Sequence, residues 1–240
     1  MKRKLIVAMA LIFCFNIAHG QESSKKYIAS FAKMPVYAES VDKGILIDLV
    51  KAIARVEGVK IDRKVTAFAR SMHNVKTGKA DFHLPLIQLP GQNSAKLEYD
   101  HSSETIFHVN FVLYTNKKKN ITLQNLEQFS IETDRAHTNY FDFKINASSC
   151  IECSLKKIAI DRIDGFIFAD FASDPFVKKN KLDLKRQLYH RFDVKIILPQ
   201  GGNGGEVDQF LTSAIKKLRA SGEYEKIMSK LDSPYDNWQP

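Results

Sequence analysis

The sequence predicts an α/β protein of two lobes that are joined by two long, crossing strands. Strand and helix patterns alternate over residues 25–87, which is typical of a parallel sheet with right-handed crossovers. Two extended runs, at 106–115 and 188–199, are longer than the other predicted strands. Residues after 200 form two amphipathic helical patterns and no strand, so they need an earlier part of the chain to pack against.

The first lobe is expected to comprise residues 21–108 together with a return segment over 191–240. The segments "KKYIASFA", "VKIDRKVT" and "ADFHLPLI" have the residue patterns of strands. Apolar residues recur with helical spacing from Leu46 until Gly58 ends the pattern, and a second helix is expected over 70–78. Together these elements predict a βαβαβ unit, which the helices of the return segment would cover.

The second lobe is expected over residues 109–190. It contains the strand patterns "FSIET" and "IDGFIFA", and a helix with Ile151, Leu155 and Ile158 on one face. Open α/β sheets bind ligands in a cleft rimmed by strand-to-helix turns, and two crossing strands can act as a hinge. A ligand cleft between the lobes is therefore expected.

Residues 1–20 have the pattern of a secretory signal peptide. "MKRK" is cationic, "LIVAMALIFCFNI" is apolar but too short to span a bilayer, and "AHG" is typical of a cleavage site, so cleavage is expected near Gly20. No later run approaches the about 20 apolar residues that a membrane helix needs. These features predict export to the periplasm.

The chain is basic, with a formal net charge of +9. Residues 1–20 contain three basic residues and no acidic one, so removal of the leader lowers the charge to +6. The basic residues are spread out and not interleaved with aromatic residues, and an exported chain is not expected to meet nucleic acid. A solvated basic surface with a weak preference for anionic ligands is predicted.

Cys150 and Cys153, in "CIEC", are the two cysteines outside the leader. A local disulfide or two spare thiols are favoured over a redox-active motif, because the pair follows the polar "NASS" and not a strand of a thioredoxin-type unit. The histidines lack the spacing of metal ligands, and the sequence contains neither a nucleophile elbow nor a phosphate-binding loop. No metal or cofactor is predicted.

Several segments, in this order, resemble the bacterial extracytoplasmic solute-binding proteins of the amino-acid (family 3) type. They are "PVYAESVDKGILIDLVKAIARVEGVKI", "VTAFARSMHNVKTGKADFHLPL", "LEYDHSSETIFHVNFVLYTNK", "LKKIAIDRIDGFIFAD" and "VKIILPQGGNGGEVDQFLTSAIKKLRASGEYEKI". The resemblance covers nearly the whole chain after the leader. It implies the type II periplasmic binding fold and the capture of a small solute by lobe closure.

The resemblance also implies a ligand class. Amino-acid binders of this type carry a G-x-T-x-T-x-x-R run after the third strand, and its arginine binds the α-carboxylate of the ligand. Residues 85–102, "PLIQLPGQNSAKLEYDHS", lack that run, although Lys96 lies near the expected place. A small polar ligand, anionic or zwitterionic and amino-acid-like, is the prediction.

Four candidate ligand-binding residues lie in the first lobe. Tyr37 follows a proline in the turn where the family stacks an aromatic ring on the ligand, and Glu39 shares that turn. Arg70 stands in the first turn of a predicted helix, where the helix dipole disfavours a cation unless an anion comes to it. We therefore expect Arg70 to bind an anion with Ser71 as a second donor, unless it pairs with Asp62 or points to water.

Four further candidates lie in the second lobe. Thr133, Arg135 and His137 belong to the strand-to-loop turn "ETDRAHTNY", which family members use to contact the ligand. Asp170 lies near the position of the acidic residue that receives a ligand ammonium group. Simple exposure to solvent is an equally good interpretation for each of the first three.

The leading hypothesis is a monomeric periplasmic binding protein that delivers a small-molecule solute to a membrane permease of the ABC type or to a sensor kinase. An enzyme on the same fold, similar to a cyclohexadienyl dehydratase, is one alternative, and it would need Glu39, Asp170 or His137 as an acid or base. The other alternative is that this protein binds no ligand and acts as a docking partner of a sensor kinase. Because the sequence supplies no paired acid and base, we expect no catalysis.

Overall fold

The computed structural model describes residues 25–240, and within them one eight-stranded sheet runs through the whole molecule in the order β2-β1-β3-β8-β4-β7-β5-β6. The signal-peptide prediction lies outside the described residues. The strands are β1 (Lys26–Ala32), β2 (Lys60–Thr66), β3 (Phe82–Ile87), β4 (Tyr99–Asn116), β5 (Ile131–Asp134), β6 (Asn146–Ser148), β7 (Gly165–Ala169) and β8 (Leu184–Pro199).

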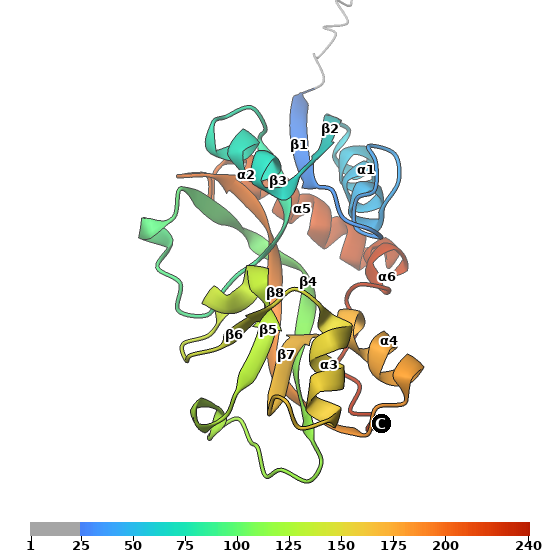
Figure 1. Ribbon diagram of the computed structural model, residues 1–240. Coiled ribbons are helices and arrows are strands. Elements are labelled where there is room, and N and C mark those ends of the chain that lie inside the picture. Colours follow the sequence, from blue (N-terminus) through green and yellow to red (C-terminus); the bar gives the residue numbers. More distant parts are fainter. Residues whose placement is uncertain (1–24) are drawn as a thin grey trace, which may run out of the picture.

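Strands β4 and β8 are the two long strands, of 18 and 16 residues, and they pass from one lobe to the other (Figure 1). They pair in antiparallel fashion from Tyr99 opposite Pro199 to Asn116 opposite Leu184, with shifts of register along the way. Each extends beyond the run that the sequence predicts. Register irregularities bend and twist a strand pair, so this ladder has the form expected of a hinge between lobes.

Lobe 1 contains β1, β2 and β3 with four helices: α1 (Ile45–Glu57), α2 (Phe68–Lys76), α5 (Glu206–Ala220) and α6 (Glu223–Met228). Strand β1 pairs in parallel with both β2 and β3, as the predicted βαβαβ unit requires. Helices α1, α5 and α6 share one apolar core on one face of the sheet, and α2 packs with Ile28 and Leu86 on the other. Gly58 ends α1 with a φ of 65°, a left-handed conformation that glycine adopts without steric cost.

Lobe 2 contains β5, β6 and β7 with α3 (Ile151–Ala159) and α4 (Asp170–Asn180), and short 3₁₀ turns that include η3 (Arg135–Tyr140). The strands β5, β6 and β7 are parallel to one another. Lobe 2 has a hydrophobic core cluster of its own, which includes Leu155, Ile158 and Phe166. Cys150 and Cys153 form a disulfide at the start of α3.

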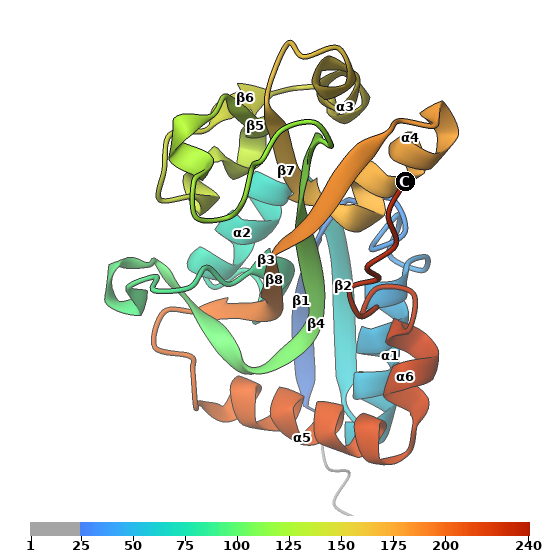
Figure 2. The ribbon, with the colours of Figure 1, turned by 90° about the horizontal axis from the view of Figure 1, so that it is seen from below.

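The chain after α6 leaves lobe 1 and crosses to lobe 2, which the sequence does not predict. We call residues 229–240 the C-terminal strap; it runs from α6 to the side of α4 (Figure 2). Its Tyr235 and Trp238 pack against the core cluster of lobe 2, and the carbonyl of Trp238 accepts a hydrogen bond from the buried Arg186 at 2.6 Å. Over residues 25–240 no helix is both long and apolar enough to cross a membrane.

Candidate functional site

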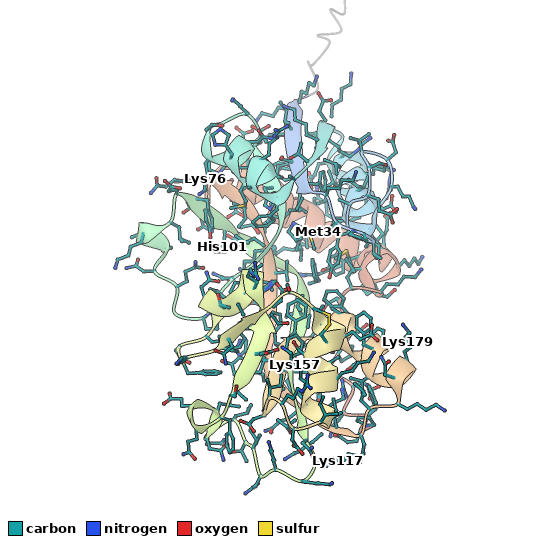
Figure 3. All side chains as sticks on the ribbon, viewed as in Figure 1. Met34, Lys76, His101, Lys117, Lys157 and Lys179 are labelled. Atoms are coloured by element: carbon teal, nitrogen blue, oxygen red, sulfur yellow. A yellow bond between two sulfur atoms is a disulfide. The ribbon has the colours of Figure 1, made fainter. Side chains whose placement is uncertain are left out.

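A cavity of about 450 Å³ lies between the two lobes and is the candidate site. Met34, which lines it, stands at the edge of lobe 1 that faces lobe 2 (Figure 3). Side chains from both lobes and from the hinge strands line the cavity. A ligand can couple the two lobes only if it contacts both of them. The lining residues are Met34, Tyr37, Phe68, Pro85, Leu86, Ile87, Leu89, Gln92, Tyr99, Phe107, Val109, Phe111, Ala136, His137, Asn139, Tyr140, Phe168, Ala169, Phe171 and Val194.

The centre of the wall is a cluster of aromatic rings around Phe111 of β4. The Phe111 ring lies 4.9 Å from that of Phe192 and 5.5 Å from that of Phe168, measured between centroids. The ring of Tyr140 lies 6.1 Å from it and nearly parallel to it. Because these rings come from β8, β7 and η3, the cluster packs lobe 2 against the hinge strands next to the cavity.

Tyr37 reaches the cavity from a strained turn. Val36 has a φ of 69°, which costs energy for a β-branched residue, and the Tyr37 N–H donates to the carbonyl of Pro35 at 2.8 Å, the spacing of a γ-turn. The Tyr37 ring lies 6.0 Å from that of Phe171, so it contacts lobe 2 across the mouth of the cavity. Burial, followed by the nearby charge of Asp170, raises the pKa of Tyr37, which keeps the phenol neutral.

Glu39 lies in the same turn but outside the cavity wall. Its carboxylate pairs with Lys43 at 2.5 Å and accepts a weak hydrogen bond from the Val36 N–H at 3.4 Å. The hydrogen bond from Lys43 is the main reason that the pKa of Glu39 is lowered. In this arrangement Glu39 stabilises the turn that presents Tyr37.

Helix α2 places Phe68 in the cavity wall and Arg70 outside it. Arg70 is exposed, and among residues 25–240 its side chain has no ion-pair or hydrogen-bond partner. Asp62, the alternative partner, pairs instead with Lys26 at 2.8 Å. The Arg70 cation therefore remains available to an anion from solution.

Ser71 faces away from the cavity into a buried polar network. Its Oγ lies 2.8 Å from Ser30 Oγ and 2.6 Å from His83 Nδ1, and all three side chains are fully buried. Asn74 Nδ2 donates to Ser30 Oγ at 3.3 Å. This network joins α2 to β1 and β3, so Ser71 fixes the helix whose first residue lines the cavity.

The His83 network predicts a loss of stability in acid. Burial lowers the pKa of His83 to about 4, whereas an unfolded histidine titrates near ~6.5. Between these values the unfolded chain binds a proton that the folded protein does not, so stability falls as the pH falls through this window. We expect His83 to account for about 2.5 kcal/mol of the loss between pH 7.5 and 4.5.

Urea unfolding at both pH values measures this contribution. His83→Asn should show a smaller loss of unfolding free energy between the two pH values than the native chain. His73→Asn, at an exposed position of the neighbouring helix α2, should show the native loss. Equal pH dependence in the native chain and in His83→Asn would contradict a neutral, buried His83.

In lobe 2, His137 lines the cavity, and its Nδ1 lies 3.1 Å from Asp134 Oδ1. Its ring lies 4.9 Å from that of Tyr140 and 5.1 Å from that of Phe168. Tyr140 also lines the cavity, and burial raises the pKa of its phenol to about 12. His137 is thus held within the aromatic wall with one nitrogen already occupied.

The other candidates of lobe 2 lie outside the wall. Thr133 is fully buried and its Oγ1 donates to the Ile167 carbonyl at 2.7 Å, so it joins β5 to β7. Arg135 is exposed at the start of η3. Asp170 begins α4 and accepts hydrogen bonds from Asn110 Nδ2 at 3.0 Å and from the Phe171 N–H at 2.7 Å.

Asp170 nevertheless lies next to the cavity, between two residues that line it. Burial is the largest influence on its carboxyl group and raises its pKa, against the hydrogen bonds from Asn110 and the Phe171 N–H. Of the candidates, the structure brings Tyr37 and His137 to the wall and leaves Asp170 behind it. Within residues 25–240, no group of three or more His, Cys, Asp or Glu side chains could hold a metal ion.

Sequence reasoning missed most of the cavity wall, above all its phenylalanines. Phe107 and Phe111 come from the long strand β4, and Phe168 and Phe171 come from the end of β7 and the start of α4. The signal was the repeated phenylalanine of "IFHVNFVLY" and "GFIFADF". Phe107 and Phe111, four residues apart on one strand, emerge on the same face of it. Such runs are also typical of ordinary core strands, and the sequence offers no means to separate the two cases.

The family model of the bacterial extracellular solute-binding proteins, family 3, matches residues 30–231. The chain belongs to this family. The match spans both lobes and the hinge, and it confirms the resemblance seen in the sequence. A search of curated protein sequences found no match.

Solved structures show that the fold is the two-lobed one that the sequence predicts. The glutamate-bound ligand-binding core of GluR0 from Nostoc punctiforme is 16% identical, with a TM-score of 0.61 over 87% of this chain and 100% of that one. ArtJ of Geobacillus stearothermophilus, an arginine-, lysine- and histidine-binding protein, is 16% identical with a TM-score of 0.59 over 90% and 97%. A histidine kinase sensor domain is also 16% identical, with a TM-score of 0.60 over 86% and 96%.

Proposed function

We propose that this family member captures a small solute in the cavity between its lobes and delivers it to an ABC-type transporter or to a sensor. The observation that carries the proposal is that lobe 1, lobe 2 and the hinge strands all contribute to the cavity wall. A ligand with contacts on both lobes stabilises the closed arrangement over the open one, and its differential affinity drives closure.

Closure is tested by small-angle scattering of the protein as it is purified and after unfolding, dialysis and refolding to remove bound molecules. Native mass spectrometry of the purified protein identifies what it carries. We expect the stripped protein to have a larger radius of gyration and to contract when the released molecules are returned. An unchanged radius, with no shift in Tm on addition, would count against capture by closure.

The assignment of individual residues is part of this proposal. Tyr37 and His137 would contact the solute directly, and Arg70 and Arg135 would meet only a part of it that extends past the rim. Three other candidates would hold the elements of the site through their intramolecular contacts. Ser71 would hold α2, Thr133 would hold β5 against β7, and Glu39 would hold the turn that carries Tyr37. Asp170 would receive a donor if the solute reaches the start of α4.

The cellular setting proposed is a monomer in the periplasm, with residues 1–20 removed. One neighbour in the comparisons belongs to an amino-acid ABC transporter and another to a histidine kinase, so either kind of partner is compatible with the fold. Mass measurement of the exported chain tests the cleavage. Light scattering of the same sample tests the oligomeric state.

We also propose that the protein is not an enzyme. Of the residues considered for acid–base chemistry, Glu39 is paired with Lys43 and Asp170 is hydrogen-bonded behind the wall. His137 alone lines the cavity, and general acid–base catalysis of a dehydration needs a positioned donor and acceptor at the substrate. Conversion of a prephenate-like acid by the purified protein would overturn this part of the proposal.

A further inference from the structure

The cavity wall carries aromatic rings from both lobes. Phe68, Tyr37 and Tyr99 come from lobe 1 or its end of the hinge, and Tyr140 and Phe171 come from lobe 2. None of the side chains that line the cavity is Asp, Glu, Lys or Arg. Its volume of about 450 Å³ lies within the range of small-molecule sites.

A free amino acid does not suit this wall. Moving a carboxylate or an ammonium group out of water without a partner costs several kcal/mol or more. The cations and anions near the cavity do not supply that partner inside it, because Arg70, Arg135 and Asp170 are not among the lining residues. A charged group is therefore disfavoured in the cavity itself.

A flat ring suits the wall better. Aromatic pairs at centroid distances of about 4.5–7 Å gain roughly 0.5–1.5 kcal/mol beyond the burial of their area. The rings of Tyr37 and Phe171 already approach to 6.0 Å from opposite lobes, and the rings of Phe111 and Tyr140 lie nearly parallel at 6.1 Å. A ligand ring between the lobes would gain such contacts from both at once, which is what drives closure.

The wall also offers a few polar atoms that lack partners within the described part of the chain. Gln92 Oε1 is buried and accepts no hydrogen bond. The hydroxyl groups of Tyr37 and Tyr140 have no hydrogen-bond partner among residues 25–240, and burial keeps both phenols neutral. These atoms can pair with a donor and an acceptor at the edge of a ring, and an unpaired buried polar atom makes such pairing favourable.

We propose that the cavity binds an uncharged, planar aromatic or heteroaromatic molecule that carries a hydrogen-bond donor at its edge. This inference rests on the proposed function of solute capture and names the chemical class of the solute. It departs from the amino-acid-like ligand that the sequence predicts, because the wall lacks the charged partners of a zwitterion.

The test is isothermal titration with matched pairs of probes: indole against L-tryptophan, and phenol against L-tyrosine. Each pair shares a ring and a donor, and the second member adds a zwitterion. L-glutamate and L-arginine complete the set. We expect indole and phenol to bind at least about tenfold more tightly than their amino-acid counterparts, equivalent to about 1.4 kcal/mol or more. L-glutamate and L-arginine should release no heat of binding.

Three variants locate the binding site. Phe171→Ala removes a ring that lines the cavity yet is 54% exposed, so the fold should tolerate it, and indole should bind several-fold more weakly. Ile160→Ala is the matched control, because Ile160 is 61% exposed and absent from the wall. Arg70→Ala tests the alternative of a charged ligand, because a probe that needs this cation would bind the variant more weakly than the native chain.

The outcomes separate this inference from the proposed function. If L-tryptophan or another charged probe binds more tightly than indole, and Arg70→Ala abolishes that binding, the inference is wrong and solute capture stands. Equal affinity of Phe171→Ala and the native chain for indole would place the molecule elsewhere and also overturn it. If no probe binds and scattering shows no closure with the released molecules, both proposals fail.

Discussion

Replacement of Arg186 by Met is expected to lower the free energy of unfolding by about 3–5 kcal/mol, the cost of removing one partner of a buried ion pair. The Arg186 side chain is fully buried, and its Nε and Nη2 donate to Asp174 at 2.9 and 2.6 Å. Without the guanidinium, the Asp174 carboxylate would remain desolvated with only Tyr114 and Trp238 as donors. Thermal unfolding should show a drop in Tm of roughly 10 °C for a chain of this length.

The same arginine attaches the C-terminal strap, so the effect should extend to residues 229–240. Its Nη1 donates to the carbonyl groups of Asp236 and Trp238, and its guanidinium lies 4.3 Å from the centre of the Trp238 ring. Trp238 is the single tryptophan of the chain. Its fluorescence should therefore move to longer wavelength in Arg186→Met before global unfolding, as the ring becomes solvated.

Two further variants are controls for Arg186→Met. Lys156→Gln removes an exposed pair with Glu152 on α3, and such helix pairs contribute only about 0.3–0.5 kcal/mol. The double variant Arg186→Met with Asp174→Leu removes both buried charges and should recover part of the lost stability. A double variant less stable than Arg186→Met alone would show that the ion pair is not the source of the effect.

Replacement of Phe111 by Ala is expected to cost about 3–5 kcal/mol in the free energy of unfolding, the usual range for a buried phenylalanine. Phe111 is 1% exposed, and its ring neighbours come from η3, β7 and the other hinge strand, β8. The space left by the ring would adjoin the cavity. Urea unfolding by circular dichroism measures the loss.

Phe111→Leu keeps most of the volume and should cost less, while Phe171→Ala should change stability by no more than about 0.5 kcal/mol because that ring is exposed. Equal effects of Phe111→Ala and Phe171→Ala would contradict a packed aromatic cluster at the hinge. The comparison also separates a ring that supports the cavity from one that only borders it.

Much of the fold could be predicted because its signals are local. The apolar face of α1 and the glycine that ends this helix lie within one short segment. The runs that become β4 and β8 are likewise each a single continuous segment. The candidate site could be predicted only in part. Tyr37 and His137 line the cavity, but Ser71 and Thr133 turn inward to partners that no local pattern reveals.

The alternation of strands and helices and the two lobes could be read from the spacing of apolar residues, because that spacing depends on neighbours along the chain. The family could be read from the resemblance of several segments to its members. Only the packed structure shows which side chains face the cavity, that the wall is aromatic and lacks Asp, Glu, Lys and Arg, and that the C-terminal strap crosses to lobe 2. These features depend on contacts between distant residues: Phe171 meets Tyr37 across the lobes, and Arg186 binds a carbonyl 52 positions away. Such pairings arise only when packing brings the segments together, and for that reason one sequence does not display them.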